Sequence, residues 1–275
     1  MSKEVAGTTV VMLGNAAIAR GAYEAGVKVS AAYPGTPSTE ISENLVKYKD
    51  ELYSEWSPNE KVATEVAIGA SISGVRALVS MKHVGVNVAS DPLYTISYSG
   101  VNGGLVLVAA DDPGIYSSQN EQDSRMVARA AMVPVIEPSD SEEARMFIKR
   151  AFELSEQYDT PIMFRTTTRL AHSQGVVHLE ERQQIPDKPY EKNIAKNVMM
   201  PGNAIKRHLV VEERLKKMAA DAATLDINKV EYNDTKIGVI TSGIPYQYVK
   251  EVLPNASVLK LGLVHPLPKT LIEEF

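Results

Sequence analysis

Short apolar runs alternate with amphipathic segments along the first 170 residues of the chain. The apolar runs predict buried strands at residues 8–13, 27–33, 75–81, 105–110, 133–136 and 161–165. Helical periodicity and helix-start residues between them predict helices, the longest of which follows Glu137 and ends near Tyr158. Strands that alternate with helices form parallel sheets, because each helix carries the chain back to the start of the next strand. The pattern therefore predicts a doubly wound α/β domain with a mostly parallel sheet.

The pattern changes after residue 170. Residues 171–202 combine Gln, Pro and scattered charge and predict a linker over the surface. Residues 203–224 predict a charged helix with an apolar stripe made by Ile205, Leu209, Leu215 and Met218. A new strand, helix and strand begin at Lys236, but about 40 residues bury little surface by themselves. We therefore divide the chain into residues 1–170, a linker with a charged helix at 171–235, and the start of a second α/β domain at 236–275.

Composition narrows the possible partners and chemistry. The net charge of −5 argues against nucleic acid or an anionic membrane surface as the main partner. The chain has no cysteine, so it cannot itself form a disulfide, a cysteine nucleophile or a cysteine-bound iron–sulfur cluster. The N-terminus lacks the apolar stretch of a signal peptide, and no apolar run approaches the roughly 20 residues of a membrane span. We expect a cytoplasmic protein.

Polar residues follow several of the predicted strands. Gly35 and Thr36 follow the second, His83 follows the third, and Asp111 and Asp112 follow the fourth. In open α/β sheets the carboxyl ends of the strands are where ligands bind. A structural interpretation stays open, because Thr-Pro-Ser suits a turn with a helix cap and Asp-Pro-Gly is typical of a turn.

Familiar phosphate, hydrolase and metal motifs are absent from the sequence. It contains no P-loop, no Gly-x-Gly-x-x-Gly after the first strand and no Gly-x-Ser-x-Gly. The five histidines show no metal-ligand spacing apart from the loose pair His172 and His178. These observations predict no metal site in the chain.

Glu60 stands at the start of a predicted helix rich in small apolar residues. Ser57 is placed to cap this helix, Pro58 suits its first position, and Glu60 falls three residues after the cap. The following turns are mostly Val, Ala, Ile and Gly. Two interpretations remain open: a glutamate that completes a capping box, or a catalytic acid in an apolar pocket.

Several of these segments together resemble the 2-oxoacid:ferredoxin oxidoreductases. The resemblance is carried by Tyr33-Pro34-Gly35-Thr36-Pro37-Ser38, Asn59-Glu60, Ile68-Gly69-Ala70-Ser71, Gly74-Val75-Arg76-Ala77 and Met81-Lys82-His83-Val84-Gly85. The run from Ala110 to Gly114, followed by Ser117-Ser118-Gln119-Asn120-Glu121-Gln122-Asp123, is similar to the alpha subunits of the indolepyruvate branch of that family. The similarity extends from about residue 8 to the end of the chain.

The resemblance implies a thiamine diphosphate enzyme. Such enzymes oxidatively decarboxylate arylpyruvates such as indolepyruvate to aryl-acetyl-CoA and pass electrons through iron–sulfur clusters to ferredoxin. Residues 1–170 would then bind the aminopyrimidine ring of the cofactor, with Glu60 hydrogen-bonded to its N1′ atom and Gly35 beside it. A glutamic acid among Ala, Val and Ile can share its proton with N1′, which favours removal of the C2 proton of the thiazolium ring.

The resemblance also implies a substrate side. Thr36 matches a threonine beside the substrate, and His83, Asp111, Asp112 and Asn120 would line the same space; Glu60, Thr36 and His83 would be the catalytic residues. Pyruvate-specific relatives carry an arginine near the end of the fourth strand for the substrate carboxylate. This chain has Asp111-Asp112 there, so the carboxylate partner stays open.

Other family features lie outside this sequence. The Gly-Asp-x motif with a downstream Asn that holds diphosphate and Mg²⁺ is absent, as are the cluster-binding cysteines. Residues 236–275 resemble the start of the family's transketolase-C-like middle domain. The resemblance thus implies an N-terminal portion of an alpha subunit, completed by the rest of that subunit and a beta subunit, and inactive alone. Two alternatives are a non-catalytic truncated or assembly chain of the same fold, and a subunit for a different 2-oxoacid.

Overall fold

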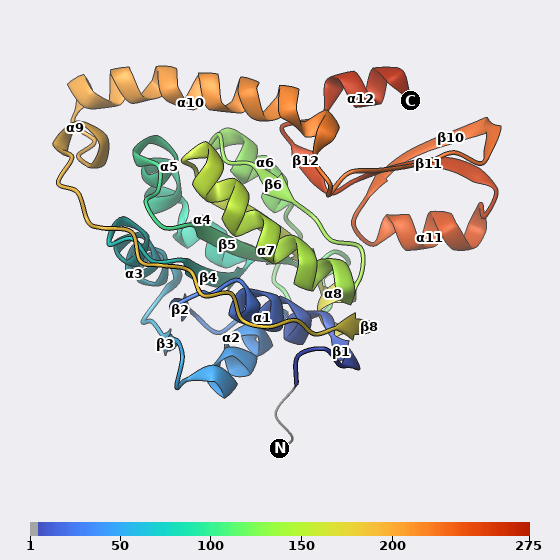
Figure 1. Ribbon diagram of the computed structural model, residues 1–275, viewed down its shortest axis with the longest axis horizontal. Coiled ribbons are helices and arrows are strands. Elements are labelled where there is room, and N and C mark those ends of the chain that lie inside the picture. The colour runs from blue at the N-terminus through green and yellow to red at the C-terminus, as the bar shows by residue number, and fades with distance from the viewer. Residues whose placement is uncertain (1–4) are drawn as a thin grey trace.

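A seven-stranded sheet forms the centre of the molecule in a computed structural model that describes residues 5–275 (Figure 1). Its strand order is β12-β6-β7-β5-β4-β2-β3, and all neighbours are parallel except β12 and β6. The strands are β2 (Val29–Ala32), β3 (Tyr53–Trp56), β4 (Ala77–Lys82), β5 (Leu105–Asp111), β6 (Val135–Ile136), β7 (Ile162–Thr167) and β12 (Leu263–His265). The predicted fold class, an α/β domain with a mostly parallel sheet, is confirmed.

Helices cover both faces of this sheet. One face packs on α1 (Gly14–Glu24), α2 (Thr39–Leu45) and α7 (Ser141–Tyr158), and the other on α3 (Glu60–Ile72), α4 (His83–Val88), α5 (Ser90–Ser99) and α6 (Ser124–Ala130). Successive strand residues alternate between the two cores, as Leu78 and Val79 do. Burial on both faces explains why these strands read as continuous apolar runs in the sequence.

The first predicted strand lies outside the main sheet. β1 (Thr9–Leu13) pairs antiparallel with β8 (Gln174–His178) in a separate two-stranded sheet. Its inclusion in the parallel sheet is therefore a wrong prediction. Val11 is 65% exposed, so only one side of this ribbon packs on the domain. A five-residue apolar run has the same sequence pattern in a central sheet and in a two-stranded ribbon. The pattern does not reveal the partner strand, which lies about 160 residues away in the chain.

A buried ion cluster fixes α1 against α7. The carboxylate of Glu24 is fully buried and accepts from Arg20 Nε at 2.8 Å and from Arg145 Nη1 at 2.6 Å. The two helices meet closely at Gly21, where a Cβ atom would lie 2.3 Å from the carbonyl oxygen of Arg145. The close contact between α1 and α7 and the ion pairs of Glu24 therefore lie in the same part of the interface.

Residues 171–227 run along the surface of the domain. After α8 (Thr168–His172) and β8, the chain is extended and mostly exposed as far as α9 (Ile194–Asn197) and α10 (Pro201–Asp221). α10 packs on α5 and buries Val211, Arg214 and Met218. Two members of its predicted apolar stripe, Ile205 and Leu209, are instead 71% and 66% exposed. The stripe faces the domain only in the second half of the helix.

A second, smaller sheet follows. Its order is β10-β11-β9, with β10 (Asp234–Ser242) parallel to β11 (Ala256–Leu261) and β9 (Lys229–Glu231) antiparallel. The helix α11 (Pro245–Val252) joins β10 to β11, as the sequence predicts, and α12 (Lys269–Glu274) ends the chain. β12 then pairs with β6 and ties the second sheet to the first. The three-part division of the chain stays a prediction.

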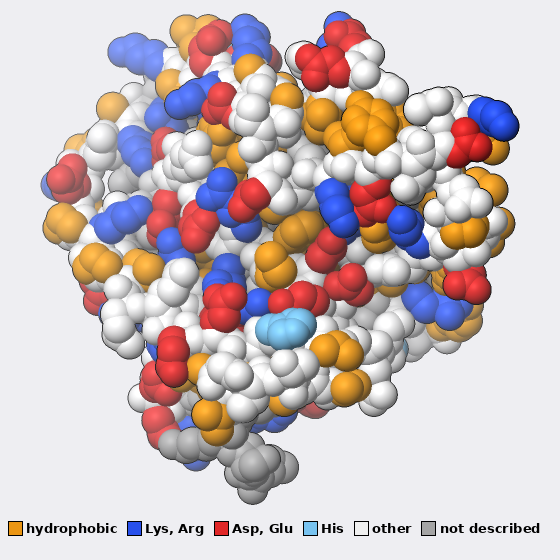
Figure 2. Space-filling view, turned by 45° about the vertical axis from the view of Figure 1, so that its right-hand side comes forward, with side chains coloured by type: hydrophobic (Ala, Val, Ile, Leu, Met, Phe, Trp, Pro, Cys, Tyr) orange, Lys and Arg blue, Asp and Glu red, His pale blue; other side chains and the backbone are white. Residues whose placement is uncertain are grey.

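The surface of the molecule is of mixed charge. Figure 2 shows acidic and basic side chains interspersed over one face of the molecule, with apolar side chains between them. None of the helices within residues 5–275 is both long and apolar enough to cross a membrane.

Candidate functional site

The residues singled out in the sequence meet at the carboxyl edge of the main sheet. Gly35 and Thr36 follow β2, His83 follows β4, Asp111 ends β5 and Asp112 follows it; β2, β4 and β5 are adjacent parallel strands. A Cβ atom on Gly35 would lie 3.1 Å from the Cβ of Lys82, so the turn after β2 lies against the end of β4. Thr36 is exposed on this turn.

Glu60 is the first residue of α3, and Asn59 caps that helix. The Asn59 side chain accepts from the Val62 amide at 3.0 Å, whereas the Ser57 hydroxyl donates to Glu55 at 2.8 Å. The prediction that Ser57 is the cap, and Pro58 the first helical residue, is therefore wrong. A capping-box glutamate stands three residues after its cap, while Glu60 stands one residue after it. The capping interpretation of Glu60 does not hold.

Glu60 is a largely buried residue, and its carboxylate is unpaired within the described part of the chain. The residue is 8% exposed, and its side-chain oxygens accept no hydrogen bond from residues 5–275. It lies over the backbone of Gly85 in α4, where a Cβ atom would be 2.6 Å from Oε1. A carboxylate that lies in a largely buried residue and has no partner in the protein is typical of a site that binds a polar ligand.

His83 begins α4 and is fully buried. Its Nε2 atom lies 3.1 Å from the carbonyl oxygen of Asn120, so the ring donates through Nε2. Nδ1 is buried and has no hydrogen-bond partner among the described residues. His83 therefore keeps one ring nitrogen free for a partner that the described chain does not supply.

Asp112 holds the start of a polar loop, residues 112–124. It accepts from the Ser117 amide at 2.8 Å, the Tyr116 amide at 3.3 Å and the Thr168 hydroxyl at 2.7 Å, and also from the Ser118 hydroxyl. Burial acts to raise its pKa, but these hydrogen bonds to the charged form outweigh it and lower the pKa to about 2. The Asp112 carboxylate is thus ionised, and its hydrogen bonds hold the backbone of the loop.

Asp111 holds the other end of the same loop. It is fully buried and accepts from the amide and hydroxyl of Ser124 and from Arg165 Nε at 2.6 Å. Helix α6 starts only at Ser124, because the polar segment before it bonds to the two aspartates. The middle of the loop lies over the end of β4, where Lys82 donates to Ser117 and His83 to Asn120.

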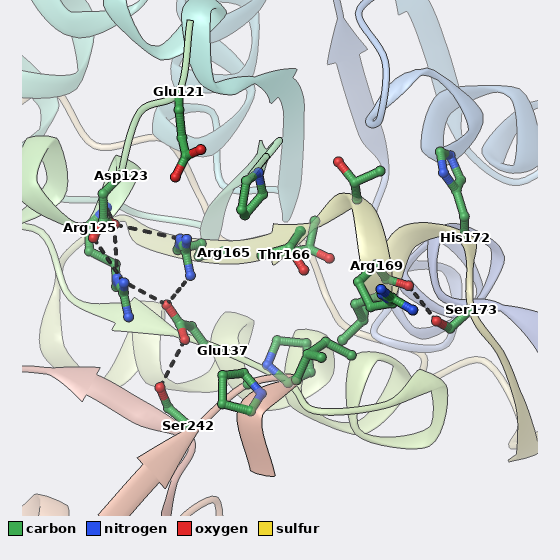
Figure 3. Close-up of a pocket in the computed structure, with 18 of the residues that line it drawn as sticks. Glu121, Asp123, Arg125, Glu137, Arg165, Thr166, Arg169, His172, Ser173 and Ser242 are labelled. Carbon is green, nitrogen blue, oxygen red and sulfur yellow. Dashed lines mark hydrogen bonds and ion pairs between the residues drawn. The ribbon is translucent and has the colours of Figure 1, made fainter. Parts of the chain in front are cut away.

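A cavity of about 910 Å³ opens beside the loop (Figure 3). It lies between the loop, the segment from Arg165 to Ser173 and the turn after β10, and neither Glu60 nor His83 lines it. Arg165, Arg125, Asp123 and Glu137 face one another on one side of it. Thr166 presents a buried hydroxyl without a hydrogen-bond partner among the described residues.

The family model for the thiamine diphosphate-binding domain of pyruvate flavodoxin/ferredoxin oxidoreductase matches residues 20–237. The chain belongs to this family. The resemblance recognised in the sequence is thereby confirmed, and the match includes every candidate site residue.

Individual relatives refine this assignment. The chain is 46% identical to the indolepyruvate oxidoreductase subunit IorA of Archaeoglobus fulgidus, over 99% of this chain and 46% of the relative. The same subunit of Pyrococcus horikoshii is also 46% identical, over 98% and 44%. The 2-oxoglutarate synthase subunit KorA of Methanothermobacter thermautotrophicus is 30% identical, over 64% and 47%. The chain thus spans about half the length of the relatives it matches.

A solved structure supports the fold. The 2-oxoglutarate:ferredoxin oxidoreductase from Magnetococcus marinus superposes with a TM-score of 0.80 over 97% of this chain and 56% of its own, at 18% identity. At that identity the likeness concerns the fold alone.

Glu60 offers one hydrogen-bonding group to a polar ligand, because its carboxylate has no partner among the described residues. Its side chain fills the space over the backbone of Gly85. No cluster of three or more His, Asp or Glu within residues 5–275 is placed to hold a metal ion.

The sequence reasoning missed Arg165, Glu137 and the role of Gly85. Arg165 is a charged residue at the end of the apolar run 161–165, and this position was the sequence signal that could have marked it as a candidate.

Proposed function

We propose that this chain is the pyrimidine-side portion of a thiamine diphosphate-dependent oxidoreductase that oxidatively decarboxylates arylpyruvates, indolepyruvate in particular, to aryl-acetyl-CoA with ferredoxin as acceptor. The observation that carries the proposal is the carboxylate of Glu60, a residue that is only 8% exposed; this carboxylate has no hydrogen-bond partner among residues 5–275 and lies against Gly85. The choice of substrate rests on the relatives. Identity is 46% to subunits named for indolepyruvate and 30% to one named for 2-oxoglutarate.

Each candidate residue has a proposed task. Glu60 would hold a proton toward N1′ of the aminopyrimidine ring, with Gly35 leaving room beside it. When bound, thiamine diphosphate supplies a carbon nucleophile for the 2-oxo carbon of the substrate. Thr36, exposed on the neighbouring turn, would contact the substrate, and His83 would accept a hydrogen bond at Nδ1.

The loop after β5 would close the substrate side. We propose that Asn120, which is exposed, faces the substrate. Asp111 and Asp112 would act by shaping the loop, since both carboxylates are already bonded within the chain. The substrate carboxylate would then need a partner other than these two.

The remaining parts would come from outside this chain. With no cysteine here, iron–sulfur clusters would be bound by other segments, as would the diphosphate and Mg²⁺. The complete enzyme would include the rest of the alpha subunit and a beta subunit, use CoA, and work in the cytoplasm. We expect no oxidoreductase activity and weak thiamine diphosphate binding from these 275 residues alone, and tight binding by calorimetry would contradict this.

Glu60→Gln tests the proposal in the complete complex. Glutamine preserves size and hydrogen bonding but cannot share the proton, so exchange of the cofactor C2 proton should be lost while thermal unfolding is unchanged. Glu65→Gln is the matched control, because its side chain lies on the same helix and is 51% exposed. Normal exchange in Glu60→Gln would refute the role of Glu60 and favour a non-catalytic assembly chain.

A further inference from the structure

Arg165 lies within the second half of β7, one strand beyond the residues proposed to act on substrate or cofactor. We infer that Arg165 is a positioning residue that holds the loop of residues 112–124 in place, and that the turn after β10 reinforces it through Glu137. The inference rests on the proposed function in one respect, namely that this loop closes the substrate side.

Arg165 joins two carboxylates from different strands. Its Nε donates to Asp111 Oδ2 at 2.6 Å, and the side chain is 10% exposed. Its Nη1 donates to Glu137 Oε1 at 2.9 Å (Figure 3). A planar guanidinium bound at two points fixes both partners in direction as well as in distance. Arg165 therefore sets the orientation of Asp111.

Asp111 passes this constraint to the loop. The same carboxylate accepts from both the amide and the hydroxyl of Ser124, which end the loop. Arg165 Nε also lies 3.7 Å from the carboxylate of Asp123. The middle of the loop in turn supplies the Asn120 carbonyl that orients His83. A continuous set of contacts thus runs from Arg165 to the proposed site.

The second sheet reaches the same set of contacts. Ser242, the last residue of β10, donates to Glu137 Oε2 at 3.1 Å, while the other oxygen of Glu137 accepts from Arg165. Gly243 has a φ of 56°, and a Cβ atom there would lie 3.2 Å from Glu137 Oε2. This turn therefore packs directly on the carboxylate that holds Arg165.

The neighbouring arginine, Arg125, does not make the contacts that Arg165 makes. Arg125 binds Asp123 at 2.8 Å and lies 3.5 Å from Glu137, but no contact joins it to Asp111. Removal of Arg165 would leave Asp111, Asp123 and Glu137 facing a single arginine. Repulsion among the carboxylates would then release Asp111 and the loop end.

Hydrogen exchange on the 275-residue chain tests the structural half of the inference. In Arg165→Gln, the amides of the 112–124 loop, Ser124 above all, should exchange at least about tenfold faster, while those of β4 and β5 keep their rates. Arg169→Gln is the control, because this arginine lines the same cavity and its side chain makes no hydrogen bond to residues 5–275. Unchanged loop amides in Arg165→Gln would overturn the inference.

Two milder variants keep the test decisive if Arg165→Gln fails to fold. Ser124→Ala removes one loop contact to Asp111, and Ser242→Ala removes the contact from the second sheet, in each case without loss of a charge. Both should raise loop exchange, Ser124→Ala more strongly. Wild-type rates in Ser124→Ala would overturn the hold on the loop, and wild-type rates in Ser242→Ala would overturn the reinforcement from the turn.

Kinetics of the complete enzyme test the functional half. A loosened loop should raise KM for the arylpyruvate at least about tenfold in Arg165→Gln, with a smaller change in kcat and unchanged C2-proton exchange. A lower kcat at unchanged KM would mean only a smaller folded fraction and would overturn the positioning role. Failure of the thiamine proposal shows separately, as normal C2-proton exchange in Glu60→Gln.

Discussion

The substitution Gly85→Ala should displace the side chain of Glu60 without changing the stability of the fold, so it tests the effect of the Glu60 position by itself. The new Cβ atom would lie 2.6 Å from Oε1, 2.7 Å from Cγ and 2.9 Å from Cδ of Glu60. Because ordinary contact begins near 3.4 Å, the carboxylate has to withdraw by about 0.8 Å from its place over α4. Cγ is in the same close contact, so the Glu60 side chain has to turn as a whole; it is flexible and can do so while the backbone stays in place.

The free energy of unfolding should hardly change. Alanine in place of glycine inside a helix stabilises it by about 0.5–1 kcal/mol. An off-rotamer glutamate costs about 0.5–1.5 kcal/mol, which offsets the gain. The difference stays within about 1 kcal/mol, or roughly 2–4 °C in Tm for a chain of this size.

The effect on the cofactor reaction should be large. A misplacement of about 1 Å can cost on the order of 100-fold in rate, so we expect C2-proton exchange in the complete enzyme to slow by about 10- to 100-fold. Gly69→Ala is the control, since its Cβ would meet nothing within 4 Å. It should stabilise α3 slightly and leave exchange unchanged. Wild-type exchange in Gly85→Ala, with Tm also unchanged, would refute the reasoning.

Three further predictions concern buried charges. Asp112→Asn should lower the free energy of unfolding by about 1–3 kcal/mol at pH 7 in urea titrations. Because the folded pKa is about 2 against 3.8, this contribution should be lost as the pH falls from about 4 toward 2. Burial lowers the pKa of Lys260 to about 8 from 10.5, so the unfolded chain binds this proton more tightly. The Tm of the wild type should therefore rise relative to that of Lys260→Met between pH 8 and 10, and a constant difference would contradict this. Arg145→Leu should cost about 3–5 kcal/mol because it removes a partner of buried Glu24, and Glu24→Leu added to it should recover part of the loss.

The sequence alone determined central strands of the sheet and the fact that the candidate residues follow their carboxyl ends. Apolar runs buried on both faces and helices between them are local patterns, so β4, β5 and β7 could be predicted to within a few residues. Since parallel strands end at one edge, the positions of Gly35, His83 and Asp111 followed from chain order.

Only the tertiary structure decided what each polar group does. Asp111 meets Arg165 across 54 positions of sequence and becomes part of a loop anchor. Glu60 loses its capping interpretation because Asn59 caps the helix, and it is left unpaired over Gly85 within residues 5–275. In the same way, β1 pairs with β8 rather than joining the main sheet. The local pattern of apolar residues indicates which positions are buried. It does not indicate which distant residue will pair with a buried charge or which strand will hydrogen-bond to a given strand. That choice is made when the folded chain brings them together.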